Sequence, residues 1–259
     1  LNVISRQTAF NQKGAIIVLV MNSIDYQLSQ IAQIIESNNA KILSFYTAKK
    51  KMAIIYRGYN FTSYCGCSYL GKFVNHKSCG YIPYRKKSKR AYRVEWEHIV
   101  PASAFGRFFP SWIKGHKRCL SSKNKSFNGR RCTRKVSNKF RLMEADLYNL
   151  MPVIGEINYF RNNLEVGSLE STLYSFGDCK IKIGSYHFEP RNEIKGLIAR
   201  TYFYMHETYK NFNIVNEENF HQLVKWNKSF PPTEFELKRS KRIERQQGNS
   251  NSFVFFLEK

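Results

Sequence analysis

Hydrophobic residues recur at helical spacing in two long stretches of the second half of the chain. Between residues 193 and 210, and again between 217 and 229, apolar side chains return every three or four positions. This is the repeat of a helix that buries one face. The same repeat predicts helices over residues 24–35 and 42–56. We interpret the two C-terminal helices as structural elements and the segment at 24–35 as a packing appendage.

Shorter elements are predicted in the middle of the chain. Residues 92–100 have the apolar character of a strand, and the run stops at Pro101. Residues 61–83 are rich in Gly and Tyr and predict short strands and turns. Residues 121–134 are polar and predict a surface loop. Short strands among helices indicate an α+β fold.

A further helical pattern runs from Asp146, an acid suited to capping a helix, to residue 163. Pro152 and Gly155 interrupt it, because proline removes a main-chain donor and glycine weakens a helix. A unit of strand, loop, strand and helix would bring His98 and Asn149 together, although 51 positions separate them.

The length of the chain limits its organisation. At 259 residues and 42% hydrophobic, it can bury one substantial core. No stretch of about 20 apolar residues occurs, so we expect no transmembrane helix. The longest apolar run, residues 15–21, is not followed by a clear small-residue cleavage site. Export therefore cannot be inferred from a targeting segment.

The charge is strongly positive. The chain holds 42 Lys and Arg against 19 Asp and Glu, a net charge of +23. Six basic residues fall within 85–93 and five within 238–245, and residues 114–141 are also dense in them. Such a charge favours a polyanionic partner, above all nucleic acid, although a cationic surface can also serve membranes or solubility alone.

The cysteines indicate an oxidising compartment. There are six of them, at positions 65, 67, 79, 119, 132 and 179. An even number favours disulfides, and 15 pairings are possible. Zinc binding is the alternative, but Cys65 and Cys67 form a C-x-C pair rather than the usual C-x₂-C spacing, and only His76 lies between them and Cys79.

The strand at residues 92–100 carries the strongest chemical signal, Glu97 beside His98. An imidazole can remove a proton from water near neutral pH, and a carboxylate can hold a hard cation against the oxygens of a substrate. The pair suits metal-assisted hydrolysis, and the net charge points to a polyanion as the substrate.

Several motifs in fixed order extend this signal. Glu97-His98 is followed by Pro101-Ala102, by the run 140–150 that ends in Leu-Tyr-Asn-Leu, and by Gly-Glu-Ile-Asn at 155–158. Further matches lie at 196–205, 226–228 and 242–249. Together they resemble the endonuclease I family of secreted and periplasmic bacterial nucleases. The resemblance runs from residue 44 to the C-terminus and leaves residues 1–43 as an N-terminal extension, expected to be helical.

The resemblance implies a mixed helical domain, residues 44–259, with short strands around a ββα-metal, or His-Me finger, active site. His98 is expected to activate water, and Glu97 and Asn149 to bind one divalent cation. Mg²⁺ is the expected cation, with Ca²⁺ or Mn²⁺ as substitutes, because oxygen ligands suit these ions.

An arginine near the phosphate is also implied by the resemblance. The segment Gly129-Arg130-Arg131-Cys132 stands where the family has Gly-Arg-Lys-Asn-Cys, so Arg130 is our choice and Arg131 remains the alternative. Arg131 and Arg161 are candidate nucleic-acid contacts, and an internal salt bridge explains Arg161 equally well.

We therefore expect a monomeric, secreted or periplasmic endonuclease that binds DNA through its phosphates, without sequence specificity, and leaves 5′-phosphate and 3′-hydroxyl ends. RNA is a second candidate substrate. Two other classes stay open. One is a catalytically weak nucleic-acid-binding protein on the same fold. The other is a zinc enzyme, although the sequence has no H-E-x-x-H motif.

Overall fold

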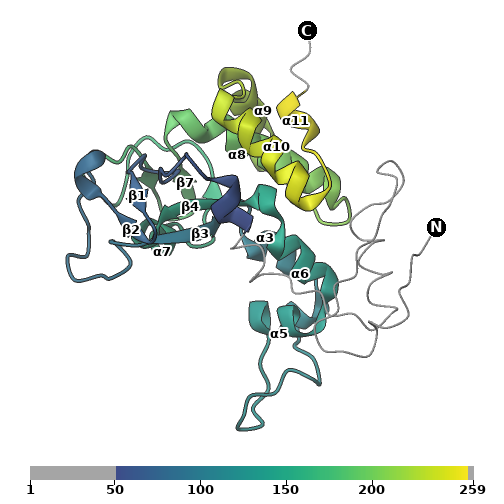
Figure 1. Cartoon of the computed structure of the whole chain (residues 1–259). Helices are drawn as coiled ribbons and strands as arrows, with labels where there is room; N and C mark the ends of the chain where they lie inside the picture. The colour runs from purple at the N-terminus through teal and green to yellow at the C-terminus, as the bar shows by residue number, and fades with distance from the viewer. Residues whose placement is uncertain (1–50, 256–259) are drawn as a thin grey trace, which may run out of the picture. The chain divides into compact units, whose positions relative to one another are not determined.

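The chain has an α+β fold in a computed structural model that describes residues 51–255 (Figure 1). Residues 51–55 are helical, as the pattern over 42–56 predicts for that part. The predicted helix at 24–35 and the extension at 1–43 lie outside the described residues. The strands are β1 (Tyr69–Leu70), β2 (Phe73–Val74), β3 (Val94–His98), β4 (Leu150–Ile154), β5 (Glu165–Val166), β6 (Lys182–Ile183) and β7 (His187–Glu189).

Helices separate and follow these strands. They are α3 (Ala102–Gly106), α4 (Pro110–Ile113), α5 (Gly129–Val136), α6 (Asn138–Ala145), α7 (Gly155–Arg161), α8 (Asn192–Thr208), α9 (Glu217–Ser229), α10 (Glu234–Gln247) and α11 (Ser252–Phe255), with 3₁₀ turns η1 (His76–Ser78) and η2 (Leu147–Asn149). In the described part of the chain, no helix is both long and apolar enough to cross a bilayer.

The two helices expected in the C-terminal half are confirmed. The predicted segments 193–210 and 217–229 are α8 and α9, which pack against each other. Asn216 begins α9: its side chain accepts from the amide of Asn219, whose side chain accepts from the amide of Asn216. This reciprocal cap satisfies main-chain donors that the helix itself leaves unpaired.

The centre of the fold is the antiparallel pair β3 and β4, with α7 directly after β4 (Figure 1). Glu97 lies opposite Met151 and His98 opposite Leu150, and α7 packs on both strands. The helix predicted over 146–163 is therefore wrong before residue 155. Pro152 has no amide hydrogen and fits a two-stranded edge, and all five residues of β4 are buried, so pairing with β3 prevails over helical spacing.

The loop predicted at 121–134 is also shorter than expected, since α5 begins at Gly129. The side chains of Cys132 and Thr133 are buried, and α5 packs against α3 and α4. Tertiary contacts thus make a helix of a strongly polar segment. The hydrophobic pattern did not single out α6 or α10 either.

All six cysteines form disulfides: Cys65–Cys179, Cys67–Cys79 and Cys119–Cys132. The expectation of disulfides is confirmed, and zinc binding by these cysteines is excluded. Cys65–Cys179 joins residues 114 positions apart. If the disulfide acts by lowering the entropy of the unfolded chain, it stabilises the fold by about 4.7 kcal/mol, against about 3 kcal/mol for Cys119–Cys132, whose separation is 13 residues.

An ion pair buried between α8 and α10 supports the C-terminal half. Arg200 Nη2 lies 2.6 Å from Glu236 Oε2, and the two side chains are 1% and 3% exposed. We expect Arg200→Met to lower the free energy of unfolding by about 3–5 kcal/mol, because Glu236 is left buried without its cation. Urea unfolding measures the loss. Arg200→Met/Glu236→Leu should be more stable than the single variant, and equal losses in the two would contradict the prediction.

Candidate active site

An open pocket of about 1490 Å³ lies along β3 and α7. Its walls include Glu95, Glu97 and His98 of β3, Asn158 of α7 and Arg130 of α5. Arg85, Arg90, Arg93 and Arg161 line it as well. Segments that are far apart in sequence thus place an imidazole, carboxylates and guanidinium groups around one space.

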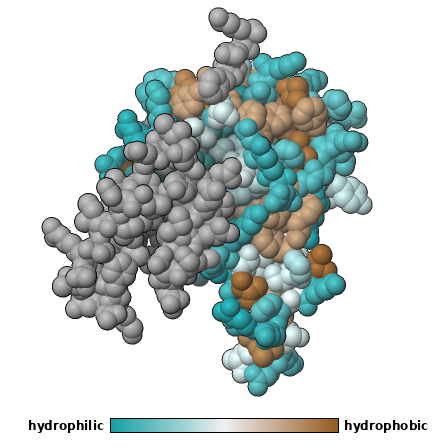
Figure 2. All heavy atoms as spheres, turned by 90° about the vertical axis from the view of Figure 1, so that its right-hand side faces the viewer, coloured by the Kyte–Doolittle hydropathy of each residue, from teal (hydrophilic) through white to brown (hydrophobic). Residues whose placement is uncertain are grey.

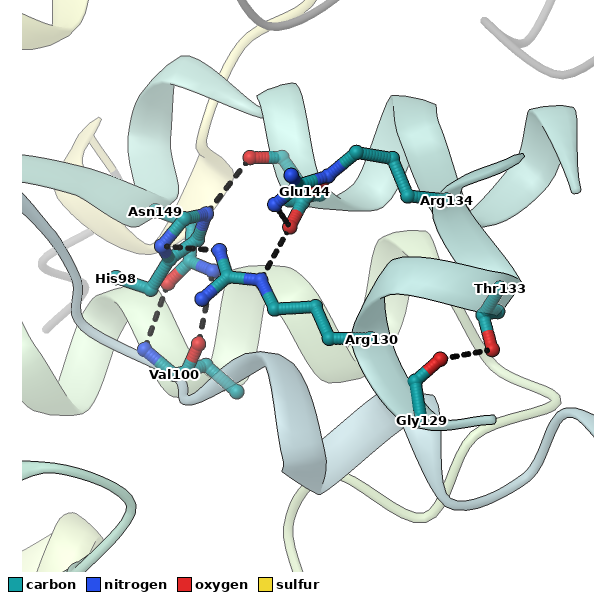
Figure 3. A network of polar contacts seen from close by, with 8 residues as sticks. All are labelled: His98, Val100, Gly129, Arg130, Thr133, Arg134, Glu144 and Asn149. Atoms are coloured by element: carbon teal, nitrogen blue, oxygen red, sulfur yellow. Dashed lines mark hydrogen bonds and ion pairs between the residues drawn. The ribbon is translucent and has the colours of Figure 1, made fainter. Parts of the chain in front are cut away.

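His98 ends strand β3 with its ring in a defined orientation (Figure 3). Nε2 lies 2.8 Å from the main-chain oxygen of Glu144, which can only accept, so Nε2 carries the proton and Nδ1 the lone pair. Burial, and then the positive charge of Arg130, lower the pKa of His98 to about 4. The ring is therefore neutral at pH 7, with the basic lone pair on Nδ1.

Arg130 lies beside this nitrogen, with Nη2 3.4 Å from Nδ1 of His98 (Figure 3). Glu144 accepts from Nε of Arg130 at 2.5 Å and from Nε of Arg134 at 2.6 Å, and so holds both guanidinium groups. Burial opposes the charge on Glu144, but the hydrogen bonds of Arg134 and the charge of Arg130 lower its pKa. Glu144 thus orients His98 through its carbonyl and Arg130 through its carboxylate.

The next arginine along the chain has a different environment. The guanidinium of Arg131 lies 4.4 Å from the ring centre of Phe127, and Arg131 does not line the pocket. Of the two arginines that the sequence left open, the geometry favours Arg130 for a role at the phosphate.

Glu97 is 4% exposed and forms an ion pair with Arg161. Arg161 Nη1 lies 3.0 Å from Glu97 Oε1, and the same guanidinium donates to the main-chain oxygens of His98 and Ile99. Burial raises the pKa of Glu97 to about 7, against the opposing charge of Arg161. Among the described residues none donates to the second oxygen, Oε2, of Glu97, and Glu97 lines the pocket.

Arg161 is itself only 1% exposed. A buried guanidinium that donates to four protein acceptors is poorly placed to bind a nucleic-acid backbone. Of the two roles that the sequence left open for Arg161, this geometry favours the internal salt bridge, which positions Glu97 and the main chain after His98.

Asn149 does not reach the pocket. Its side chain is fully buried, and its Oδ1 and Nδ2 pair with the amide and carbonyl of Val100 at 2.7 and 3.0 Å (Figure 3). Asn149 therefore clamps the turn after β3. The arrangement does not fit the role of cation ligand expected for it.

A different amide, Asn158 on α7, lines the pocket. Its Nδ2 donates to Glu95 Oε2 at 3.1 Å, and this bond fixes the orientation of the amide. Asn158 ends the motif Gly-Glu-Ile-Asn at 155–158, from which no role was predicted for it. The sequence did hold a signal for its position: Asn158 and Arg161 lie three positions apart, so a helix places both on one face.

The remaining wall is rich in arginine. Arg90 Nη2 and Arg93 Nη2 both pair with Glu95, at 2.5 and 2.7 Å. The guanidinium of Arg85 lies 4.6 Å from the ring centre of Tyr159, and its amide donates to Glu156. A pocket with this many guanidinium groups attracts anions, and phosphate oxygens match their donors.

Comparison with known proteins agrees with this chemistry. Residues 8–256 match the sequence pattern of the endonuclease I family. Endonuclease-1 of Buchnera aphidicola subsp. Acyrthosiphon pisum (strain APS) is 38% identical over 221 residues, which cover 83% of this chain and 81% of that protein. The match starts within residues 1–43, so the boundary near residue 43 stays a prediction.

Two relatives come from Aeromonas hydrophila. An extracellular deoxyribonuclease is 34% identical over 218 residues, which cover 82% of this chain and 88% of that protein. A periplasmic deoxyribonuclease is 33% identical over 218 residues, which cover 82% and 85%.

Proposed function

The chain belongs to the endonuclease I family, and from this premise we propose that the pocket around His98 hydrolyses phosphodiester bonds with the help of one divalent cation. The protein is an endonuclease that degrades DNA without sequence specificity. The observation that carries the catalytic proposal is the orientation of His98, whose Nε2 is held by the carbonyl of Glu144 while Nδ1 lies beside Arg130.

His98 is the proposed general base. Its Nδ1 takes a proton from water, and the hydrogen bond from Nε2 to Glu144 keeps the ring in place while it becomes charged. Arg130 then stabilises negative charge on the non-bridging oxygens of the phosphate, since its guanidinium lies next to the water-activating nitrogen. Glu144 holds Arg130 in this position.

The donors in the pocket fit a hard divalent cation. Glu97 Oε2 and the oxygen of Asn158 would hold it, with Glu95 close by through its hydrogen bond to Asn158. When bound, the cation supplies positive charge to the phosphate oxygens. The family implies a divalent cation, and we propose Mg²⁺, because it keeps several water ligands and needs few from the protein. Ca²⁺ and Mn²⁺ are the proposed substitutes.

We extend the same proposal to the product ends, the substrate range and the oligomeric state. Attack by water on phosphorus breaks the bond to the 3′ oxygen, which takes up a proton from water, and so leaves 5′-phosphate and 3′-hydroxyl ends. Contacts to phosphate do not distinguish sequences, and RNA is a candidate second substrate. We propose that the protein acts as a monomer.

The protein is secreted or periplasmic. Relatives carry the names extracellular and periplasmic deoxyribonuclease. The three disulfides agree, because such bonds persist in oxidising compartments.

Plasmid cleavage tests the proposed function. Supercoiled plasmid, single-stranded DNA and RNA are each incubated with the protein and Mg²⁺, Ca²⁺, Mn²⁺ or chelator. We expect the plasmid to be cut in Mg²⁺ and to stay intact in chelator. Full activity in chelator would exclude the cation. Plasmid that is bound but uncut with every cation would favour the binding protein over the enzyme, and activity restored by zinc alone would favour the zinc enzyme.

A further inference from the structure

The chain between the two halves of the active site is free of acidic residues. No Asp or Glu occurs from residue 99 to 143, whereas twelve Lys and Arg do. Figure 1 shows that part of this stretch, the loop between α4 and α5, extends away from the helices around it. We call residues 116–128 the basic arm.

The arm is an ordered hairpin. Leu120 and Ser126 form a bridge, and the amide of Phe127 donates to the carbonyl of Cys119 at 3.0 Å. Asn124 makes the tip turn with φ of 53°, in the left-handed region that Asn tolerates. The disulfide Cys119–Cys132 joins the base of the arm to α5.

Four cations point outward from the arm. Lys117, Arg118, Lys123 and Lys125 are all exposed. None of the four forms an ion pair with a carboxylate of the described residues. In Figure 2 the lower lobe includes the arm, and hydrophilic residues cover much of its surface. A cationic surface without internal partners is available to an external anion.

The arm is continuous with the catalytic pocket. Its last residue, Asn128, is followed by Gly129 and then by Arg130, which lines the pocket beside His98. Phe127 holds the guanidinium of Arg131 at 4.4 Å, so cationic groups continue from the arm to α5. A polyanion that leaves the pocket past Arg130 therefore meets the arm.

We propose that the basic arm is a second binding surface for the phosphate backbone of the substrate, outside the pocket where the bond is cut. The proposal rests on the function proposed above. One strand of duplex DNA carries a phosphate about every 3.4 Å along the axis, and the four exposed cations of the arm can contact up to four of them.

The test compares two variants of equal charge. One replaces Lys117, Arg118, Lys123 and Lys125 by Gln. The matched control replaces four exposed basic residues of α9 and α10, Lys225, Lys228, Lys241 and Arg245, by Gln. Figure 1 places α9 and α10 at the opposite end of the described domain from the arm. Thermal melting confirms that both variants fold.

Binding of a 30-base-pair duplex is measured by fluorescence anisotropy in chelator, across salt concentrations. We expect the arm variant to raise Kd at least about tenfold at 0.15 M salt and to reduce the log-log salt slope by up to about 3.6, at about 0.9 for each phosphate contact. The control should change both much less. Equal losses in the two variants, or an unchanged Kd in the arm variant, would overturn the proposal.

Two further measurements separate the arm from the chemistry and from another partner. Hydrolysis of a nitrophenyl phosphodiester of thymidine, which has no second phosphate, should be the same in the parent and the arm variant. A loss there would show that the arm acts on the pocket.

If the arm variant loses binding to anionic phosphatidylglycerol vesicles but keeps duplex binding, the arm serves membranes and the proposal fails. A parent that binds duplex without cutting anything would refute the proposed function and leave the arm test intact.

Discussion

His98→Ala is expected to lower kcat by about 10²–10⁴ while duplex DNA and the cation still bind, since removal of a general base costs about that much. The side chain donates to the carbonyl of Glu144 and lies 3.4 Å from Arg130, but it holds neither residue by itself. Arg130 stays bonded to Glu144, and Arg161 stays bonded to Glu97. The measurement is single-turnover cleavage of a labelled duplex at saturating Mg²⁺.

The matched control is His221→Ala, an exposed histidine of α9, which should leave kcat unchanged. If His98→Ala keeps near-parental kcat, or if more Mg²⁺ restores it completely, His98 is not the base. A rise in KM alone would assign His98 to substrate binding instead.

The two amides, Asn158 and Asn149, should behave differently when cation binding is measured. Glu97→Gln and Asn158→Ala are each expected to raise the Mg²⁺ concentration for half-maximal cleavage at least about tenfold, because the first removes the negative charge of a proposed ligand and the second removes a proposed ligand oxygen. Excess Mg²⁺ should relieve part of the defect. Titration calorimetry with Mg²⁺ in the absence of DNA should show the same weakening.

Asn149→Ala is expected to act on stability. Its side chain satisfies the amide and carbonyl of Val100 inside the protein. Leaving these groups buried and unpaired costs about 1–3 kcal/mol each. A lower melting temperature with unchanged Mg²⁺ affinity would support this role. Weaker Mg²⁺ binding at an unchanged melting temperature would instead restore Asn149 as the ligand that the motif implied.

The sequence by itself determined the features that depend on neighbouring residues. Helices α8 and α9 lie close to the predicted ranges, because their apolar repeats are long and α9 begins with a reciprocal cap. Glu97 and His98 lie at the end of a strand, as the run before Pro101 predicts. The net charge and the even number of cysteines predicted a polyanionic partner and disulfides without any knowledge of the fold.

Only the tertiary structure decided which distant residues meet. The pairing of six cysteines depends on which loops lie side by side, and Cys65–Cys179 joins residues 114 positions apart. Helix α5 forms in a polar segment because Cys132 and Thr133 are buried against neighbouring elements. Pairing with β3 made residues 150–154 a strand, against their helical spacing.

The same limit applies to the site. Asn149 and Asn158 stand in adjacent motifs, and nothing in their composition separates them. One is turned into the core toward Val100 and the other toward the pocket, because Asn149 precedes a buried strand while Asn158 lies on the face of α7 that carries Arg161. Only the tertiary structure shows that Arg161 forms a buried ion pair with Glu97. Local sequence fixes which side chains are available, and only long-range packing sets the direction in which each one points.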